Sequence, residues 1–554
     1  MSEIIKVTIL KENNAEIIVK HDTDVTLMST LLKENLISGA FCGGRGSCGR
    51  CRILFLSGTP IPAVSDRSTF TPDELRKGYR LACMARPKQD CVIRLDLIEL
   101  DNVPRQIEIL TTVQHMNNND KSVINNINKS NYNNFNISNN NADGEVNRLE
   151  NAAYMIAVDL GTTTIAMQLM DMKFGNVIDT YCAMNPQRSY GADVLSRIQA
   201  ANNGHAQNLR DSVWRVLQAG VERFSNIGEI CCMCIAGNTT MEHLLMGLST
   251  ENLGRSPFTP VEIGLQKCKL PYSGNIDTKN EAGTELQVYI TPGISAFVGG
   301  DIVAGLYHCG LLDVLQSEHT YYKSGAFLFI DLGTNGEMAI TDGRRMIVTA
   351  TSAGPAFEGG ANASVPGSDM IAVTASLLKR GIIDETGLLD EAYFEEGIDF
   401  PIQDIKGSVE TVIHLTQKDI RDIQMAKAAV RAGIEILYEK MGQPKLTHVY
   451  LAGGFGYYLD VNAAITVGLL PEHTRNIVTA AGNTSLAGAY EMGRDLWTGR
   501  LNEEILTNGL NMNNRTNVNN KLNGLNNIES LNLAGQENFE TLYLNFLNFP
   551  ATEA

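Results

Sequence analysis

MIAVDLGTTTIAMQLMD at residues 155–171 and FLFIDLGTNGEMAITD at residues 327–342 have the same layout. Each joins an apolar stretch, the tetrapeptide Asp-Leu-Gly-Thr, a short polar pair and a second apolar stretch. Short apolar stretches separated by a polar break indicate two strands joined by a turn. Two copies of this layout in one chain favour the internal duplication of an α/β half.

A turn of this composition suits a phosphate group. Glycine and threonine present backbone N–H groups and hydroxyls to phosphate oxygens. An aspartate at the end of the preceding strand can hold Mg²⁺ through water, since Mg²⁺ keeps much of its hydration shell. Asp159 and Asp331 occupy that place in the two copies. One copy would be weak support, and two copies behind apolar strands are much stronger.

A third segment extends the pattern. HVYLAGGFGYYLD at 448–460 predicts a strand that runs into Gly453, Gly454 and Gly456. Glycines at such a place let a planar base approach the backbone closely. IAGNTTMEHLL at 235–245 predicts a strand that leads into a helix. Together with the paired turns, these segments resemble the phosphate, adenosine and connecting motifs of the actin, sugar kinase and Hsp70 superfamily, which implies ATP binding.

A cysteine-rich loop, FCGGRGSCGRC, lies at residues 41–51. Four thiolates are needed to hold a [2Fe–2S] cluster, and glycines let a loop wrap around it. The candidate ligands are Cys42, Cys48, Cys51 and, after a gap of 31 residues, Cys83. A zinc site is the alternative, but structural zinc usually uses two separated short knuckles, and this loop contains only one Cys-x-x-Cys. The spacing resembles that of adrenodoxin-like and bacterial [2Fe–2S] ferredoxins.

The chain around this loop has the pattern of a small β-rich domain. IIKVTIL and AEIIVK, with a polar turn between them, predict a hairpin, and VTLMSTLLKENL has helical spacing. TPDELRKG predicts a short helix with Thr71 as its N-cap and Gly78 as its stop. The block matches a ferredoxin β-grasp fold. We therefore expect an α+β ferredoxin β-grasp domain followed by an α/β actin-like, duplicated ribonuclease H-like ATPase domain.

Asparagine-rich stretches mark the expected boundaries. The stretch within 114–150 shows no hydrophobic period and predicts a disordered linker. A second such patch predicts a loop insertion, because strand and helix character returns after it. We expect a ferredoxin domain at residues 1–97, a linker at 98–152 and a nucleotide-binding domain at 153–554. The loop insertion lies inside that last domain, at 508–527.

Bulk composition narrows the class of protein. The 554 residues are 44% hydrophobic and carry a formal net charge of −17, which argues against non-specific nucleic-acid binding. No apolar run is long enough for a membrane span, and the N-terminus lacks the apolar core of a signal peptide. Eleven cysteines are better explained as metal ligands or buried thiols than as disulfides in a cytoplasmic protein, which is the expected location.

A ferredoxin block joined to such an ATPase-like core resembles the reductive activators of corrinoid proteins. The resemblance includes GNTTM (237–241), GGDIVAG (299–305), DLGTNGE (331–337), AGPAFEGG (353–360) and LAGGFG (451–456). It implies a [2Fe–2S] cluster held by the four cysteines, ATP with Mg²⁺, and one electron passed to Co(II) of a corrinoid protein to regenerate Co(I). Implied partners are that corrinoid protein of a methyltransferase system and an upstream electron donor, with no nucleic acid and no membrane. The oligomeric state is left open, with a homodimer as one alternative.

Site residues follow from the resemblance position by position. It implies catalytic roles for Asp159, Asp331 and Glu337. It implies nucleotide contacts for Gly161, Thr162, Thr163, Thr164, Asn238, Gly333, Thr334, Asn335, Gly336, Gly453, Gly454 and Gly456.

Two other classes of function stay open from the residues alone. One is a small-molecule kinase with an accessory ferredoxin, which would need a catalytic base in the cleft between the lobes. The other is a non-enzymatic electron carrier or redox sensor whose ATPase-like core only docks a partner.

Overall fold

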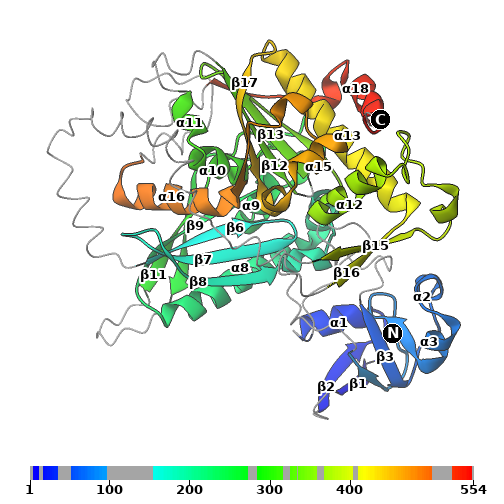
Figure 1. Ribbon diagram of the computed structural model, residues 1–554. Helices are drawn as coiled ribbons and strands as arrows, with labels where there is room; N and C mark the ends of the chain where they lie inside the picture. Colours follow the sequence, from blue (N-terminus) through cyan, green and yellow to red (C-terminus); the bar gives the residue numbers. More distant parts are fainter. Residues whose placement is uncertain are drawn as a thin grey trace.

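The computed structural model describes residues 4–10, 16–34, 36, 51–95, 154–272, 284–315, 325–333, 335–358, 367–403, 410–501 and 527–551. The expected linker at 98–152 and all but the last residue of the expected insertion at 508–527 lie outside these ranges. Figure 1 shows a small N-terminal unit and a larger part built on two sheets. Among the described residues, no helix is both long enough and apolar enough to span a bilayer.

The N-terminal unit is a five-stranded sheet in the order β2-β1-β5-β3-β4. The predicted hairpin forms, since β1 pairs antiparallel with β2, and β1 also pairs in parallel with β5. The Thr71 side chain caps its helix by accepting from the Glu74 N–H, and Gly78 ends that helix in the left-handed conformation, both as predicted. The elements are β1 (Ile4–Leu10), β2 (Glu16–Asp22), α1 (Leu27–Lys33), β3 (Arg52–Ser57), α2 (Val64–Thr69), α3 (Pro72–Lys77), β4 (Tyr79–Leu81) and β5 (Cys91–Arg94).

The first lobe of the larger part is a six-stranded sheet in the order β10-β11-β9-β6-β7-β8. Its central strand β6 is buried along most of its length, as the continuous apolar run in the sequence requires. The strands are β6 (Tyr154–Leu160), β7 (Thr164–Asp171), β8 (Val177–Met184), β9 (Ile230–Gly237), β10 (Gln266–Tyr272) and β11 (Thr284–Ile290). The helices are α7 (Val194–Ala200), α8 (Ala206–Ser225), α9 (Thr239–Met246), α10 (Gly300–His308) and α11 (Leu311–Val314).

The second lobe is a six-stranded sheet in the order β18-β17-β12-β13-β14-β19, with a separate two-stranded hairpin, β15-β16. The strands are β12 (Ala326–Leu332), β13 (Asn335–Thr341), β14 (Met346–Ser352), β15 (Ile398–Gln403), β16 (Glu410–Leu415), β17 (Leu446–Ala452), β18 (Val478–Gly482) and β19 (Ile528–Ser530). The helices are α12 (Gly367–Lys379), α13 (Gln417–Lys440), α14 (Gly453–Tyr458), α15 (Val461–Thr466), α16 (Thr484–Thr498) and α18 (Phe539–Asn545).

The two large sheets repeat one another, as the duplicated segments predict. In the first sheet, β6 pairs antiparallel with β7 and in parallel with β9. In the second sheet, β12 pairs antiparallel with β13 and in parallel with β17, so β6 corresponds to β12 and β9 to β17. Asp159 lies opposite Ala236 and Asp331 opposite Ala452 in these parallel pairs. The duplication therefore brings the two aspartates to equivalent ends of the two central strands.

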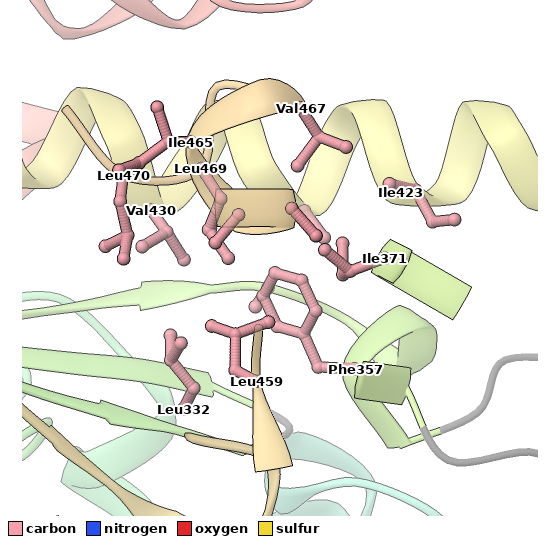
Figure 2. Packing of buried hydrophobic residues seen from close by; sticks show 14 of the residues in the cluster. Leu332, Phe357, Ile371, Ile423, Val430, Leu459, Ile465, Val467, Leu469 and Leu470 are labelled. Atoms are coloured by element: carbon pink, nitrogen blue, oxygen red, sulfur yellow. The ribbon is translucent and has the colours of Figure 1, made fainter. Parts of the chain in front are cut away.

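The second lobe has its own apolar core between its sheet and its helices. Figure 2 shows Phe357 and Ile371 packed toward Leu459 and Leu332, with side chains of α13 above them. This core positions β12 and the turn that follows it. The residues labelled there are Leu332, Phe357, Ile371, Ile423, Val430, Leu459, Ile465, Val467, Leu469 and Leu470.

Another apolar core contains residues of both lobes, and helices α10 and α16 cross within it. It contains Met155 of β6, Phe329 of β12 and Leu486 of α16. Helices α10 and α16 approach so closely that a Cβ atom on Gly488 would lie 1.9 Å from the carbonyl oxygen of Ala304. Only glycine allows this contact, and α16 packs in addition against β6 and β9 of the first sheet.

Candidate functional site

The first Asp-Leu-Gly-Thr turn joins β6 to β7. A Cβ atom on Gly161 would lie 2.8 Å from the carbonyl oxygen of Thr164, so the turn is too tight for a larger residue. The Asp159 carboxylate accepts hydrogen bonds from Asn483 Nδ2 at 2.9 Å and from Ser485 Oγ at 3.0 Å. Both donors lie at the start of α16, the helix that follows β18. Helix α16 therefore holds the Asp159 carboxylate in place.

Asn238 connects this turn to α9. Its Oδ1 accepts from the Met241 N–H at 3.0 Å, which makes it the N-cap of the helix. Its Nδ2 donates to Thr162 Oγ1 at 3.1 Å. The structure therefore brings together two residues that lie 76 positions apart in sequence and that both belong to the predicted nucleotide set.

The second turn joins β12 to β13. The Gly333 N–H donates to the Asn335 carbonyl at 2.8 Å, and Gly336 begins the buried part of β13. Asp331 and Glu337 lie directly opposite each other on the paired strands. The remaining member of this turn's predicted set, Thr334, lies outside the described residues.

The predicted adenosine glycines lie in the first turns of α14, directly after β17. Gly453 has a φ of 82°, a left-handed conformation that favours glycine. A Cβ atom there would lie 2.6 Å from Asp331 Oδ1. Gly453 and Gly454 start the helix, and Gly456 is buried against Leu451. The third predicted segment therefore packs directly against the second phosphate turn.

Buried carboxyl groups gather where the two turns meet. Burial and then the charge of Asp159 raise the pKa of Asp301 to about 7. Burial, followed by Asp301 and Asp159, raises the pKa of Asp331 to about 8. Burial, Asp301 and Asp331 also raise the pKa of Glu337, and burial raises that of Asp159. Carboxyl groups that raise one another's pKa in this way form a site that favours a cation.

The cation would be held largely through other ligands. Within the described ranges, no group of three or more His, Cys, Asp or Glu side chains converges closely enough to hold a metal by itself. Mg²⁺ commonly binds proteins through one or two carboxylates, with waters and substrate phosphates as its other ligands. The carboxyl groups fit that mode of binding.

Asp301 is a site residue that sequence reasoning missed. It lies in the first turn of α10, behind Gly299 and Gly300. A Cβ atom on Gly299 would lie 2.5 Å from Asn238 Cα, so this segment packs against the start of α9. One usable sign in the sequence is the aspartate after two glycines in GGDIVAG, but the burial of Asp301 depends on the packing of both lobes.

The cysteine site is described in part. Cys51 and Cys83 are both buried, and their sulfurs lie 3.2 Å apart. That distance is too long for a disulfide, which needs about 2.05 Å. Two thiolates on one tetrahedral metal lie roughly 3.7 Å apart when each metal–sulfur bond is about 2.3 Å. The observed separation is shorter than that, so the two buried thiols lie close enough together to be candidate ligands of one metal ion, while Cys42 and Cys48 lie outside the described residues.

Comparison with known families covers most of the chain. Residues 10–88 match the 2Fe-2S iron-sulfur cluster binding domain. Residues 154–313 match the RACo middle region. Residues 325–364 and 361–554 match the C-terminal domain of RACo, the ASKHA domain.

Individual relatives agree with these matches. The corrinoid activation enzyme RamQ of Eubacterium limosum is 29% identical over 403 residues, which are 62% of this chain and 64% of that protein. The [Co(II) methylated amine-specific corrinoid protein] reductase of Methanosarcina barkeri is 24% identical over 388 residues, 61% of this chain and 69% of that protein.

A solved structure extends the agreement to the whole chain. The structure titled reductive activator for corrinoid, iron-sulfur protein is 25% identical, with a TM-score of 0.58 and 99% of both chains covered. The order of the three matched regions, the duplicated sheets and the buried thiol pair are consistent with that likeness. The chain belongs to the family of reductive activators of corrinoid proteins.

Proposed function

We propose that this protein uses ATP to pass one electron from a [2Fe–2S] cluster to the Co(II) of a corrinoid protein, which restores Co(I). The observation that carries the proposal is the presence of two sites in one chain. A buried thiol pair lies in the N-terminal unit, and carboxyl-lined paired turns lie between the two lobes. A small-molecule kinase would use the paired turns but gives the thiol pair no role, and a simple electron carrier has no use for the turns.

Cys51 and Cys83 would hold one iron, with Cys42 and Cys48 as the proposed remaining ligands. The cluster, when bound, supplies a one-electron carrier that is oxidised as Co(II) is reduced to Co(I) and is reduced again by an upstream donor. Burial of both described thiols in the apolar core of the domain keeps water from that side of the site. The chain's contribution is thus to position and shield the sulfur ligands.

The paired turns would bind ATP with Mg²⁺. Backbone N–H groups at both turns suit the phosphates, Asp159 and Asp331 suit the hydrated cation, and Gly453 and Gly454 leave room for the base. Reducing Co(II) is unfavourable with an ordinary ferredoxin. ATP can assist only by binding more tightly to the state of the complex in which the cobalt is easier to reduce.

We also propose that the protein is cytoplasmic and that an upstream donor supplies its electron. The oligomeric state stays open, with a homodimer as one alternative. The location is supported by cysteine chemistry. Among the described residues, no two cysteines form a disulfide, as expected where the cell keeps thiols reduced.

Anaerobic reduction of a purified corrinoid protein in the Co(II) state tests the proposal. We expect the Co(I) absorbance to grow with reductant, this protein and Mg·ATP together, and to grow at least tenfold more slowly without ATP. Asp331→Asn should behave like the reaction without ATP while keeping the cluster's visible absorbance. Equal rates of reduction with and without ATP would show that the nucleotide is not coupled to electron transfer.

A further inference from the structure

A buried arginine lies directly behind the first phosphate turn. Arg197 on α7 is 0% exposed. Its Nη2 donates to the Thr162 carbonyl at 2.6 Å, its Nε to the Gly191 carbonyl at 3.0 Å, and its Nη1 contacts Met241 Sδ at 3.1 Å. Burying a guanidinium is costly unless its hydrogen bonds are satisfied. The fold therefore surrounds this cation with acceptors directly behind one of the two turns where phosphates are expected.

The carbonyls of Gly161, Thr162 and Thr163 in the turn each accept a hydrogen bond from Asn185 or Arg197. Asn185 Nδ2 donates to the Gly161 carbonyl at 2.8 Å, and the Asn185 N–H donates to the Thr163 carbonyl at 2.9 Å. Arg197 binds the carbonyl between them. In a trans peptide the C=O of one residue and the N–H of the next point in opposite directions. Because Arg197 binds the Thr162 carbonyl, the Thr163 N–H of the same peptide points away from Arg197.

The arrangement closes on itself through α9. Thr162 Oγ1 accepts from Asn238, Asn238 Oδ1 accepts from the Met241 N–H, and Met241 Sδ accepts from Arg197. Arg197 in turn holds the Thr162 carbonyl. This ring of four residues locks the orientation of the Thr162–Thr163 peptide to the N-terminus of α9.

We propose that Arg197 is a positioning residue for the nucleotide's phosphates. It turns the Thr162–Thr163 peptide so that its N–H faces the polyphosphate of a Mg·nucleoside triphosphate, and it adds a fixed positive charge behind the turn. This inference rests on the proposed nucleotide site and adds a residue that the paired-turn motif does not contain.

The geometry requires a guanidinium. Three nitrogen atoms of one planar fork reach two carbonyls and a thioether that come from three separate segments. A lysine ammonium is a compact charge on a flexible stem and cannot hold all three from one position. A lysine at this position would keep the charge and lose the orientation of the turn.

The test compares phosphate-dependent with phosphate-independent binding in the full-length protein. Arg197→Lys and Arg197→Ala are measured for Mg·ATP and Mg·ADP by calorimetry, and for adenosine by ligand-observed NMR. We expect the Kd for both nucleotides to rise at least tenfold and the Kd for adenosine to stay within twofold. Arg210→Lys is the matched control, because Arg210 on α8 donates to the Leu245 carbonyl and does not touch the turn. That control should leave all three values within twofold.

Chemical rescue separates positioning from general support of the fold. Added guanidinium ion should restore Mg·ATP binding to Arg197→Ala, and ethylammonium ion should not. If Arg197→Ala does not fold, Met241→Leu removes one acceptor of the fork at similar size. It should weaken Mg·ATP binding severalfold and spare adenosine.

The outcomes distinguish this inference from the proposed function. Wild-type protein that binds no Mg·ATP would defeat the proposed function itself. Wild-type binding that is unchanged in Arg197→Lys, or an adenosine affinity that falls as far as the ATP affinity, would show that Arg197 does not position the turn.

Discussion

Cys51 and Cys83 lie 32 positions apart in the chain, yet their sulfurs are neighbours because β3 and β4 pair. Arg52 lies opposite Leu81 in that pair, and the Ala82 N–H donates to the Cys51 carbonyl at 2.7 Å. The spacing of the cysteines predicted a shared site from sequence. Strand pairing is the physical reason that Cys83, far along the chain, reaches Cys51.

Cys51→Ser should remove the cluster. Serine is a poor replacement for a thiolate ligand, so anaerobically reconstituted protein should fall from about two irons per chain to near none and lose its visible absorbance. Cys91→Ser is the control, because Cys91 is buried in β5 and burial raises the pKa of its thiol to about 12. Iron content retained in Cys51→Ser, or lost equally in both variants, would contradict this assignment of the ligands.

Asp301 could not be assigned to the candidate site from the sequence alone. Asp159 and Asp331 were predictable because each sits in a repeated motif at a strand end. Asp301 belongs to no repeat, and its place beside them follows from the packing of α10 between the lobes. Arg197 was missed for the same reason, since nothing in the sequence near α7 points to the turn at Thr162.

Asp301→Asn should stabilise the nucleotide-free protein and weaken nucleotide binding. The pKa of Asp301, raised to about 7, exceeds that of an unfolded aspartate, so its ionisation favours unfolding increasingly from about pH 4 to 7. At pH 8 the variant should melt a few degrees higher than wild type, and the difference should vanish near pH 4. Calorimetry should show a Kd for Mg·ATP at least tenfold higher. A variant that melts lower at pH 8 and binds normally would contradict both expectations.

At the scale of elements, the repeated strands, their turns and the strand entering Gly453 follow from hydrophobic pattern. The strand and helix character in the sequence after the second asparagine-rich patch corresponds to β19 and α18. The order of strands in the sheets did not follow from pattern alone, because long-range pairing is set by packing. The burial of Lys427 on α13 could not be predicted either, since lysine is normally a surface residue.

Lys427 anchors the C-terminal segment to α13. Its Nζ donates to the Asn548 carbonyl and lies 5.0 Å from the centre of the Phe549 ring. Beside it, Gln424 Nε2 donates to the Leu547 carbonyl at 2.9 Å. One helix face therefore holds consecutive carbonyls of the chain's last described stretch.

Lys427→Met should change how stability depends on pH. Burial, and then the charge of Arg431, lowers the pKa of Lys427 to about 7. Between about pH 7 and 10 the unfolded chain then binds one more proton than the folded chain, so this lysine's contribution to stability rises with pH. Over pH 7 to 9, the free energy of unfolding of the variant should fall relative to wild type by up to about 1.4 kcal/mol per pH unit.

Chemical denaturation at several pH values measures that difference. Lys418→Met is the control, because Lys418 is exposed on the same helix. Parallel curves for Lys427→Met and wild type would mean that Lys427 keeps its charge in the folded protein.

At the scale of the whole molecule, the apolar cores define what unfolds together. One core consists only of residues of the N-terminal unit, from Val7 to Ile93 in the chain. Another contains residues of both lobes, including Met155 and Phe329. The two lobes are therefore expected to behave as one cooperative body and the N-terminal unit as a separate one.

Scanning calorimetry should show two transitions with different sensitivities. Mg·ATP at about 100 times its Kd should stabilise the two-lobed part by about 2.7 kcal/mol and leave the other transition unchanged. Loss of the cluster in Cys51→Ser should shift only the N-terminal transition. A single transition that responds to both changes would show that the cores are coupled.

The contact between Gly488 and Ala304 limits how α10 and α16 can move. Two backbones already touching cannot be pressed closer, and separating them would open a void in the core around them. The two helices are therefore expected to move as one piece. Because Asn483 and Ser485 at the start of α16 bind the Asp159 carboxylate, a displacement of α10 is expected to reach the first Asp-Leu-Gly-Thr turn through α16.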